Sequence, residues 1–191
     1  MRIVRRGLTV AGASIAACFV AGVATGLWSR VLMWILAATA PARAGEVTHE
    51  RAVVGQRTLE GTINLVLIVV AAGAVTGAPV YIVVRRWLPA RVVLKGLSFA
   101  AVLLAVFGPY VLDGDYEYFR YGHPAISVAL FLTTFVVFGL VSAALAERWA
   151  GAPAQPPRRW LTIVGVPFLA ALGVWGAARL DATLSGVYHL Y

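Results

Sequence analysis

The sequence predicts an all-α membrane protein, a five-transmembrane-helix bundle with its N-terminus inside and an outer interfacial segment after helix 1. Of the 191 residues, 61% are hydrophobic and only 13% are charged, whereas a typical soluble domain is roughly 25% charged. A soluble chain of this length cannot bury so many apolar side chains, because much of its surface must face water. The apolar residues also gather into long runs between charges, as membrane-spanning helices require. We therefore treat residues 1–191 as a single membrane domain.

Five stretches are long enough, or nearly so, to cross the hydrocarbon core, which takes about 20 residues of helix. Backbone polar groups cannot stay unpaired in lipid, so we expect each stretch to be helical. The first is longer than the apolar core of a signal peptide, about 7–15 residues, so we expect an uncleaved anchor. The predicted helices are 7–29, 61–84, 96–112, 124–146 and 160–178, with an outer loop at 30–60.

The apolar segment Val31–Ala40 follows the first span and leaves two geometries open. One helix through both segments would be about 50 Å long, so it would protrude from the bilayer. Otherwise the second segment lies along the outer interface. In both cases Pro41 ends the segment, because proline has no N–H to donate.

The distribution of basic residues predicts the orientation, because Arg and Lys accumulate in cytoplasmic loops. With the N-terminus inside, ten basic residues fall in inner segments and six in outer segments. All six tryptophans fall near span ends, where the headgroup region favours indole rings. Both observations predict that the N-terminus is inside and the C-terminus outside.

Small residues predict which helices pack together. The first span contains a G-x-x-x-G motif at Gly22 and Gly26, and the second contains another at Gly73 and Gly77. Such motifs let two helix backbones approach closely in lipid. We expect these two spans to pack on each other inside the bundle, with a homodimer contact as the alternative.

The chemistry of the predicted spans is limited. They contain no Asp, Glu, Lys, Arg or His, the residues that mark ion paths and proton relays in membranes. Neither a proton pump nor a haem protein with intramembrane ligands is predicted, and no catalytic or cofactor-binding residue is assigned. Cys18 is the single cysteine, which excludes an internal disulfide. The net charge of +8 is scattered between apolar runs, so nucleic acid is not a predicted partner.

The outer segment between Asp113 and Pro124 holds the candidate metal ligands. Carboxylates at Asp113, Asp115 and Glu117 would suit a hard cation such as calcium, although the rest of an EF-hand loop is missing. With other histidines, His123 would suit zinc or copper. The competing interpretation is a solvated loop in which Arg120 pairs with a carboxylate.

Several segments resemble uncharacterised multi-pass membrane proteins of high-GC Gram-positive bacteria. The residues that carry the resemblance are Ser29–Met33, Ala37–Pro41, Val54–Thr62, Arg86-Trp87-Leu88-Pro89 and Asp113–Pro124. The resemblance implies a location in the bacterial plasma membrane and implies no particular activity.

Three functions are compatible with the sequence. The first is a non-enzymatic component that contacts another membrane protein, or a second copy of itself, through helix faces or the outer loop. The second is a small channel or carrier for a neutral or apolar solute, lined by neutral polar side chains at Asn64, Thr76, Thr133 and Thr134. The third is an outward-facing metal site at the acidic segment. Apart from the lipid bilayer, no partner can be named.

Overall fold

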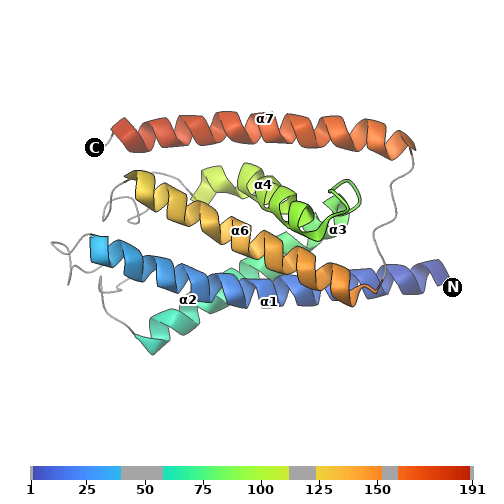
Figure 1. Ribbon diagram of the computed structural model, residues 1–191, viewed down its shortest axis with the longest axis horizontal. Coiled ribbons are helices and arrows are strands. Elements are labelled where there is room, and N and C mark those ends of the chain that lie inside the picture. The colour runs from blue at the N-terminus through green and yellow to red at the C-terminus, as the bar shows by residue number, and fades with distance from the viewer. Residues whose placement is uncertain (1, 40–57, 112–123, 152–158, 190–191) are drawn as a thin grey trace.

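The computed structural model describes residues 2–39, 58–111, 124–151 and 159–189. Every regular element in these ranges is helical, which confirms the all-α prediction. The elements are α1 (Arg2–Thr39), α2 (Leu59–Ala72), η2 (Gly73–Gly77), α3 (Ala78–Val84), α4 (Val92–Val111), α6 (Pro124–Trp149) and α7 (Arg159–His189). Figure 1 shows α1, α6 and α7 extended along the long axis of the molecule.

Within the described residues, four helical segments are long and apolar enough to cross a membrane. They are Gly7–Thr39, Leu59–Val84, Val92–Pro109 and Ile126–Trp149. These segments match the first four predicted spans and are compatible with a multi-pass membrane protein. Four of their eight boundaries lie beyond the predicted ones, at Thr39, Leu59, Val92 and Trp149, because the helices continue past the apolar runs into flanking charged residues.

The first helix is continuous. α1 contains 38 residues, which corresponds to about 57 Å at the standard helical rise. Val31–Thr39 therefore extends the first helix, and Ala40 lies outside the described residues. Figure 1 shows the N-terminal end of α1 reaching past the ends of α3 and α6.

The second span contains a π-helical turn. In η2 the Ala78 N–H donates to the Gly73 carbonyl, one residue further than in an α-helix. Pro79 follows at the start of α3. Because proline has no N–H and crowds the preceding turn, a local widening of the helix accommodates it.

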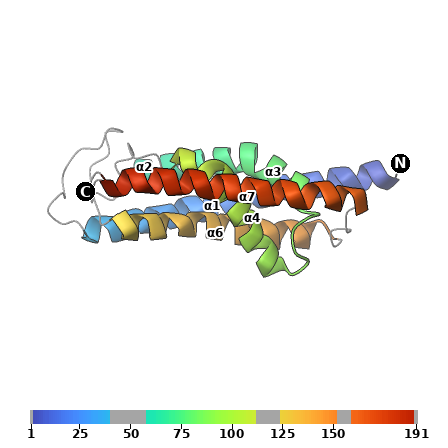
Figure 2. The ribbon, with the colours of Figure 1, turned by 90° about the horizontal axis from the view of Figure 1, so that it is seen from above.

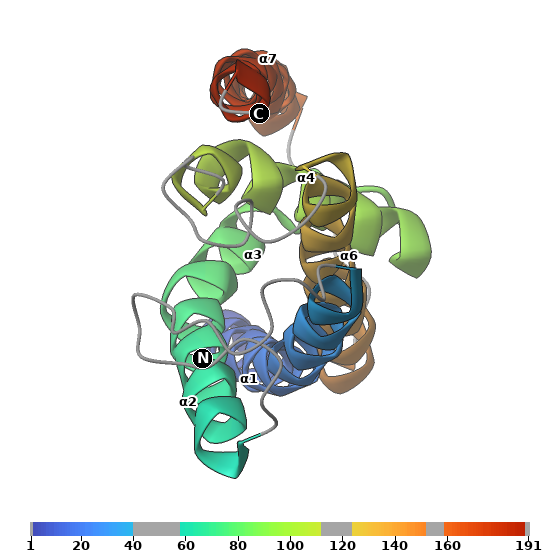
Figure 3. The ribbon, with the colours of Figure 1, turned by 90° about the vertical axis from the view of Figure 1, so that its left-hand side faces the viewer.

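The helices pack in layers. α1 lies between α2 and α6, α4 packs on α6, and α7 packs on α4. Figure 3 shows α4 between α7 and the α1–α2 pair, and Figure 2 shows α7 running along most of the bundle. At the centre the Tyr81 ring meets Phe99 edge-on with centroids 4.9 Å apart, and Phe99 lies 6.3 Å from Phe138. This aromatic row joins α3, α4 and α6.

Candidate functional site

The sequence-predicted metal ligands cannot be placed. Asp113, Asp115, Glu117 and His123 all lie outside the described residues, so the metal site remains a prediction. Among the residues that are described, no three His, Cys, Asp or Glu side chains gather into a group that would hold a metal ion.

The two glycine motifs serve different contacts. A methyl group at Gly22 would lie 2.7 Å from the Val70 Cα, and one at Gly26 would lie 2.8 Å from the Val66 Cα. The first motif therefore lets the α1 backbone approach α2. Gly73 and Gly77 instead face the Phe138 ring of α6, where added methyl groups would lie 2.6 and 2.8 Å from ring carbons. The second motif thus provides space for an aromatic side chain.

The hydroxyl groups considered for a solute path bond to their own helices. Thr76 donates to the Ala72 carbonyl and Thr134 to the Phe131 carbonyl, each at 2.6 Å. Thr133 donates to the Leu130 carbonyl. Asn64 is exposed on α2. Hydroxyl donors used in this way are not available to a passing solute, so this arrangement does not favour a channel.

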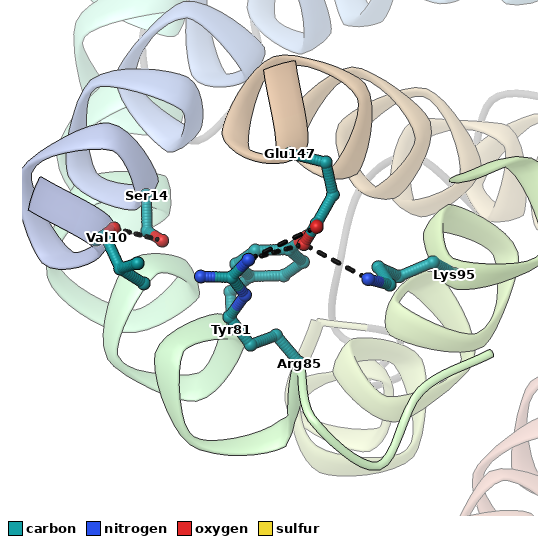
Figure 4. Close-up of polar contacts among 6 residues, drawn as sticks. All are labelled: Val10, Ser14, Tyr81, Arg85, Lys95 and Glu147. Carbon is teal, nitrogen blue, oxygen red and sulfur yellow. Dashed lines mark hydrogen bonds and ion pairs between the residues drawn. The ribbon is translucent and has the colours of Figure 1, made fainter. Parts of the chain in front are cut away.

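The most distinctive polar site is a buried cluster centred on Glu147. We call Tyr81, Arg85, Lys95 and Glu147 the Glu147 cluster. Tyr81 lies in α3 and Arg85 follows one turn later at its C-terminal cap, so their side chains project from one face. Lys95 lies in the first turn of α4, and Glu147 lies in the last turn of α6. Three helical segments thus contribute to one site, and Glu147 is more than 50 residues from the other members (Figure 4).

Glu147 accepts contacts from all three partners. Its Oε1 lies 3.0 Å from Arg85 Nη2 and 3.1 Å from Lys95 Nζ. The Tyr81 hydroxyl donates to the same oxygen at 3.0 Å. Arg85 Nη2 also donates to Oε2 at 3.2 Å. One carboxylate therefore ties α3, α4 and α6 together.

The Glu147 cluster is shielded from the surroundings. Tyr81 is fully buried, Lys95 is 2% exposed and Arg85 is 6% exposed, while the Glu147 side chain is 11% exposed. Removing one partner from a buried ion pair typically costs about 3–5 kcal/mol, because the other charge stays uncompensated. The contacts in this cluster are therefore far more consequential than surface ion pairs.

The Glu147 cluster is not electrically balanced. Two cations face one carboxylate, which leaves one positive charge in excess. In addition, the buried Nε of Arg85 has no hydrogen-bond partner among the described residues. Both the charge and the donors of the cluster exceed what Glu147 can satisfy.

Sequence reasoning did not single out this cluster. Arg85, Lys95 and Glu147 each lie one residue outside a predicted span, so they were placed in inner loops. The structure instead includes Lys95 and Glu147 in helices, because α4 begins at Val92 and α6 continues to Trp149. The sequence contained one indication of the cluster: all three residues adjoin span ends that the predicted orientation places on the inner side.

At the opposite end of the bundle, polar contacts to neutral acceptors join the helices. The Trp28 indole N–H donates to the Thr133 hydroxyl at 2.8 Å, linking α1 to α6. Arg30 Nη2 donates to the Thr58 carbonyl at 3.4 Å, just before α2 begins. Trp28 was predicted to be an interfacial anchor, and the structure shows that it also makes a contact between helices.

Comparison with protein-family models, with curated proteins and with solved structures finds no match to this chain.

Proposed function

We propose that this chain is a five-span plasma-membrane protein that acts without catalysis, by contact of its helices with another membrane protein or a second copy. The N-terminus is proposed to be inside and the C-terminus outside. Three observations support this proposal: the four apolar helices, the direction in which α7 runs along α4, and the exposed face of α7.

The position of α7 supports a fifth span. Ala105 of α4 lies against Gly176 of α7, and Leu180 lies beside Gly108. The two helices therefore run in the same direction along each other. A chain that crosses outward at α4 and inward at α6 would cross outward again at α7, which matches this parallel arrangement.

The charge distribution supports the orientation. We call the end of the bundle that holds the Glu147 cluster the Arg85 end, and the end that holds Trp28, Arg30 and Thr58 the Arg30 end. At the Arg85 end, the described side chains comprise five cations and one anion, namely Arg85, Arg86, Arg91, Lys95, Arg148 and Glu147. Positive charge favours the cytoplasmic side, so we assign the Arg85 end to the inside.

The observation that carries the proposed contact function is the open face of α7. A methyl group at Gly173 would meet nothing within 4 Å, and Val174 is 72% exposed. Ala177, one turn after Gly173, is also exposed. Small residues on a lipid-facing helix allow a second helix to approach closely. The glycines of the two G-x-x-x-G motifs are already covered by neighbouring helices, whereas Gly173 of α7 is open.

Cysteine crosslinking in native membranes tests this proposal. Val174 and Val75 are both 72% exposed but lie on different helices, so Val174→Cys and Val75→Cys form a matched pair. Both are made in a Cys18→Ala background, so that the introduced thiol is the single one in the chain. We expect Val174→Cys to give one reproducible crosslinked species and Val75→Cys to remain monomeric. Only monomer from Val174→Cys, or the same products from both variants, would contradict the proposal.

A further inference from the structure

The excess positive charge of the Glu147 cluster requires an explanation that the packing of the helices does not give. A buried charge without a counter-charge is strongly unfavourable, and a buried donor without an acceptor adds to that cost. Glu147 neutralises one of the two cations, Arg85 and Lys95, and both of its oxygens are already engaged. Arg85 retains a buried Nε–H without an acceptor among the described residues. A second anion at this place would satisfy both the charge and the donor.

The location of the cluster indicates what that anion is. Tyr81 and Glu147 lie within the last turn of their apolar segments, and Lys95 lies within the first turn of its segment. The cluster is therefore at the level where the apolar part of the bundle ends. Arg86, Arg91 and Arg148 surround this end and are exposed. At this level a membrane presents the phosphate groups of its lipids, and basic pockets between transmembrane helices bind such headgroups.

We propose that the Glu147 cluster binds a phosphate group, with Arg85 and Lys95 as the donors. The guanidinium fork suits phosphate oxygens, and the compact ammonium adds a second charge. Glu147 is a positioning residue in this arrangement, because both cations contact its carboxylate. Figure 4 shows Arg85 and Lys95 reaching Glu147 from opposite sides.

The excess charge of the cluster indicates which kind of phosphate group would neutralise it. The cluster has one uncompensated positive charge, and a phosphodiester carries one negative charge. A phosphodiester without a cation of its own, such as the headgroup of phosphatidylglycerol, would therefore neutralise the cluster. In phosphatidylcholine the choline cation cancels the charge of the phosphate, and a free phosphate dianion would overcompensate the cluster. The same phosphate chemistry is available from a lipid or from solution, and the experiment separates these two sources.

The test uses the full-length purified protein in neutral detergent. Binding of phosphatidylglycerol and of phosphatidylcholine with the same acyl chains is compared by native mass spectrometry, or by the concentration of lipid that raises Tm half-maximally. Inorganic phosphate is a third ligand in the Tm assay, alone and in competition with phosphatidylglycerol. The Tm assay is run at about 0.5 M salt, where attraction between exposed charges is strongly screened.

Two variants distinguish the cluster from a generally basic surface. Lys95→Met removes the excess charge and leaves Arg85 and Glu147 as a balanced pair, so we expect this variant to fold. Arg148→Gln removes an exposed cation from the same end and changes the net charge by the same amount. The comparison of lipids in the unmodified protein does not depend on how either variant folds.

We expect the unmodified protein to bind phosphatidylglycerol at least about tenfold more tightly than phosphatidylcholine. Lys95→Met should reduce this preference to about twofold or less, and Arg148→Gln should change it by less than about twofold at high salt. Competition by inorganic phosphate would support a site that also takes free phosphate, and its absence would support a lipid headgroup. Equal binding of the two lipids, or equal losses in the two variants, would overturn the proposal. The proposed contact through α7 does not enter this test.

Discussion

The two ends of the helix bundle are held together by different interactions. At the Arg85 end, one buried carboxylate joins three helices through two cations and a phenol. At the Arg30 end, a neutral hydrogen bond from Trp28 to Thr133 and a contact from Arg30 to a carbonyl join the helices. The charged side chains described in that half are Arg30, Glu60, Arg179 and Asp181, whose charges cancel.

This difference shows that polar contacts of unequal strength can join the helices of one apolar bundle. Close packing at Gly22 and Gly26 brings α1 to α2, and between membrane helices such packing takes the place of a hydrophobic driving force. The ionised contacts lie where the apolar segments end, and removing one partner there would leave a buried charge uncompensated. Breaking them is therefore expected to affect the bundle more than breaking any single contact at the Arg30 end.

The largest effect is expected from Glu147→Ala. This change leaves Arg85 and Lys95 buried without a counter-charge, which should lower the free energy of unfolding by about 3–5 kcal/mol. Unfolding in mixed detergent micelles, followed by circular dichroism, measures the change. As a control, Glu60→Ala removes an exposed carboxylate in the first turn of α2, and it should cost less than about 1 kcal/mol. Equal losses in both variants would remove the distinction between the two ends.

A tight backbone contact nearer the Arg30 end provides the next comparison. The methyl group added by Gly26→Ala would lie 2.8 Å from the Val66 Cα, so α1 and α2 must separate. We expect a loss of about 1–3 kcal/mol in the same unfolding assay. Gly12→Ala is the matched control on α1, because a methyl group there meets nothing within 4 Å. A stable Gly26→Ala protein would show that packing at this position is looser than the structure indicates.

Tyr81→Phe examines one donor of the Glu147 cluster. The variant loses the hydrogen bond to Glu147 but keeps a ring that can pack on Phe99. We expect a loss of about 1.5 kcal/mol, since the acceptor is charged. Repeating the change in a Glu147→Gln background should give a smaller loss, and this double-mutant cycle isolates the contact. An unchanged loss in that background would show that the effect does not come from the contact with the Glu147 carboxylate.

The smallest effect is expected for the contact between Trp28 and Thr133. A cycle of Trp28→Phe and Thr133→Val should give a coupling energy of about 0.6 kcal/mol, which is typical of side-chain hydrogen bonds between membrane helices. The readout is again the free energy of unfolding in mixed micelles. A coupling energy as large as the loss in Glu147→Ala would show that the contact at the Arg30 end is as strong as those at the Arg85 end.

Much of the fold was predictable from local composition. The four helices that are long enough to cross a membrane lie where apolar runs were found, because the need to satisfy backbone groups in lipid converts such runs into helices. The continuity of α1 was not predictable, since both geometries for Val31–Ala40 satisfy the same local requirements. In the continuous helix, Leu32 and Leu36 of this segment are buried, so the continuous form goes with tertiary packing.

The candidate site was less predictable than the fold. The first glycine motif indicated a close approach of helices, but the residues facing it, Val66 and Val70, carry no motif of their own. The role of Gly73 and Gly77 depends on Phe138, more than 60 residues later in the chain. Such pairings are set by the register between helices, which apolar patterns do not encode.

The sequence by itself determined that the chain forms apolar helices and that positive charge collects next to particular span ends, because both properties follow from the local order of residues. Only the tertiary structure decided that Arg85, Lys95 and Glu147 meet in one buried cluster. Residues 62 positions apart come within hydrogen-bond distance when the lengths of α3 and α6 and the way they pack bring their ends to the same level. A residue at the edge of an apolar run faces water, lipid or another helix according to that packing, and its charge has a different energetic consequence in each case.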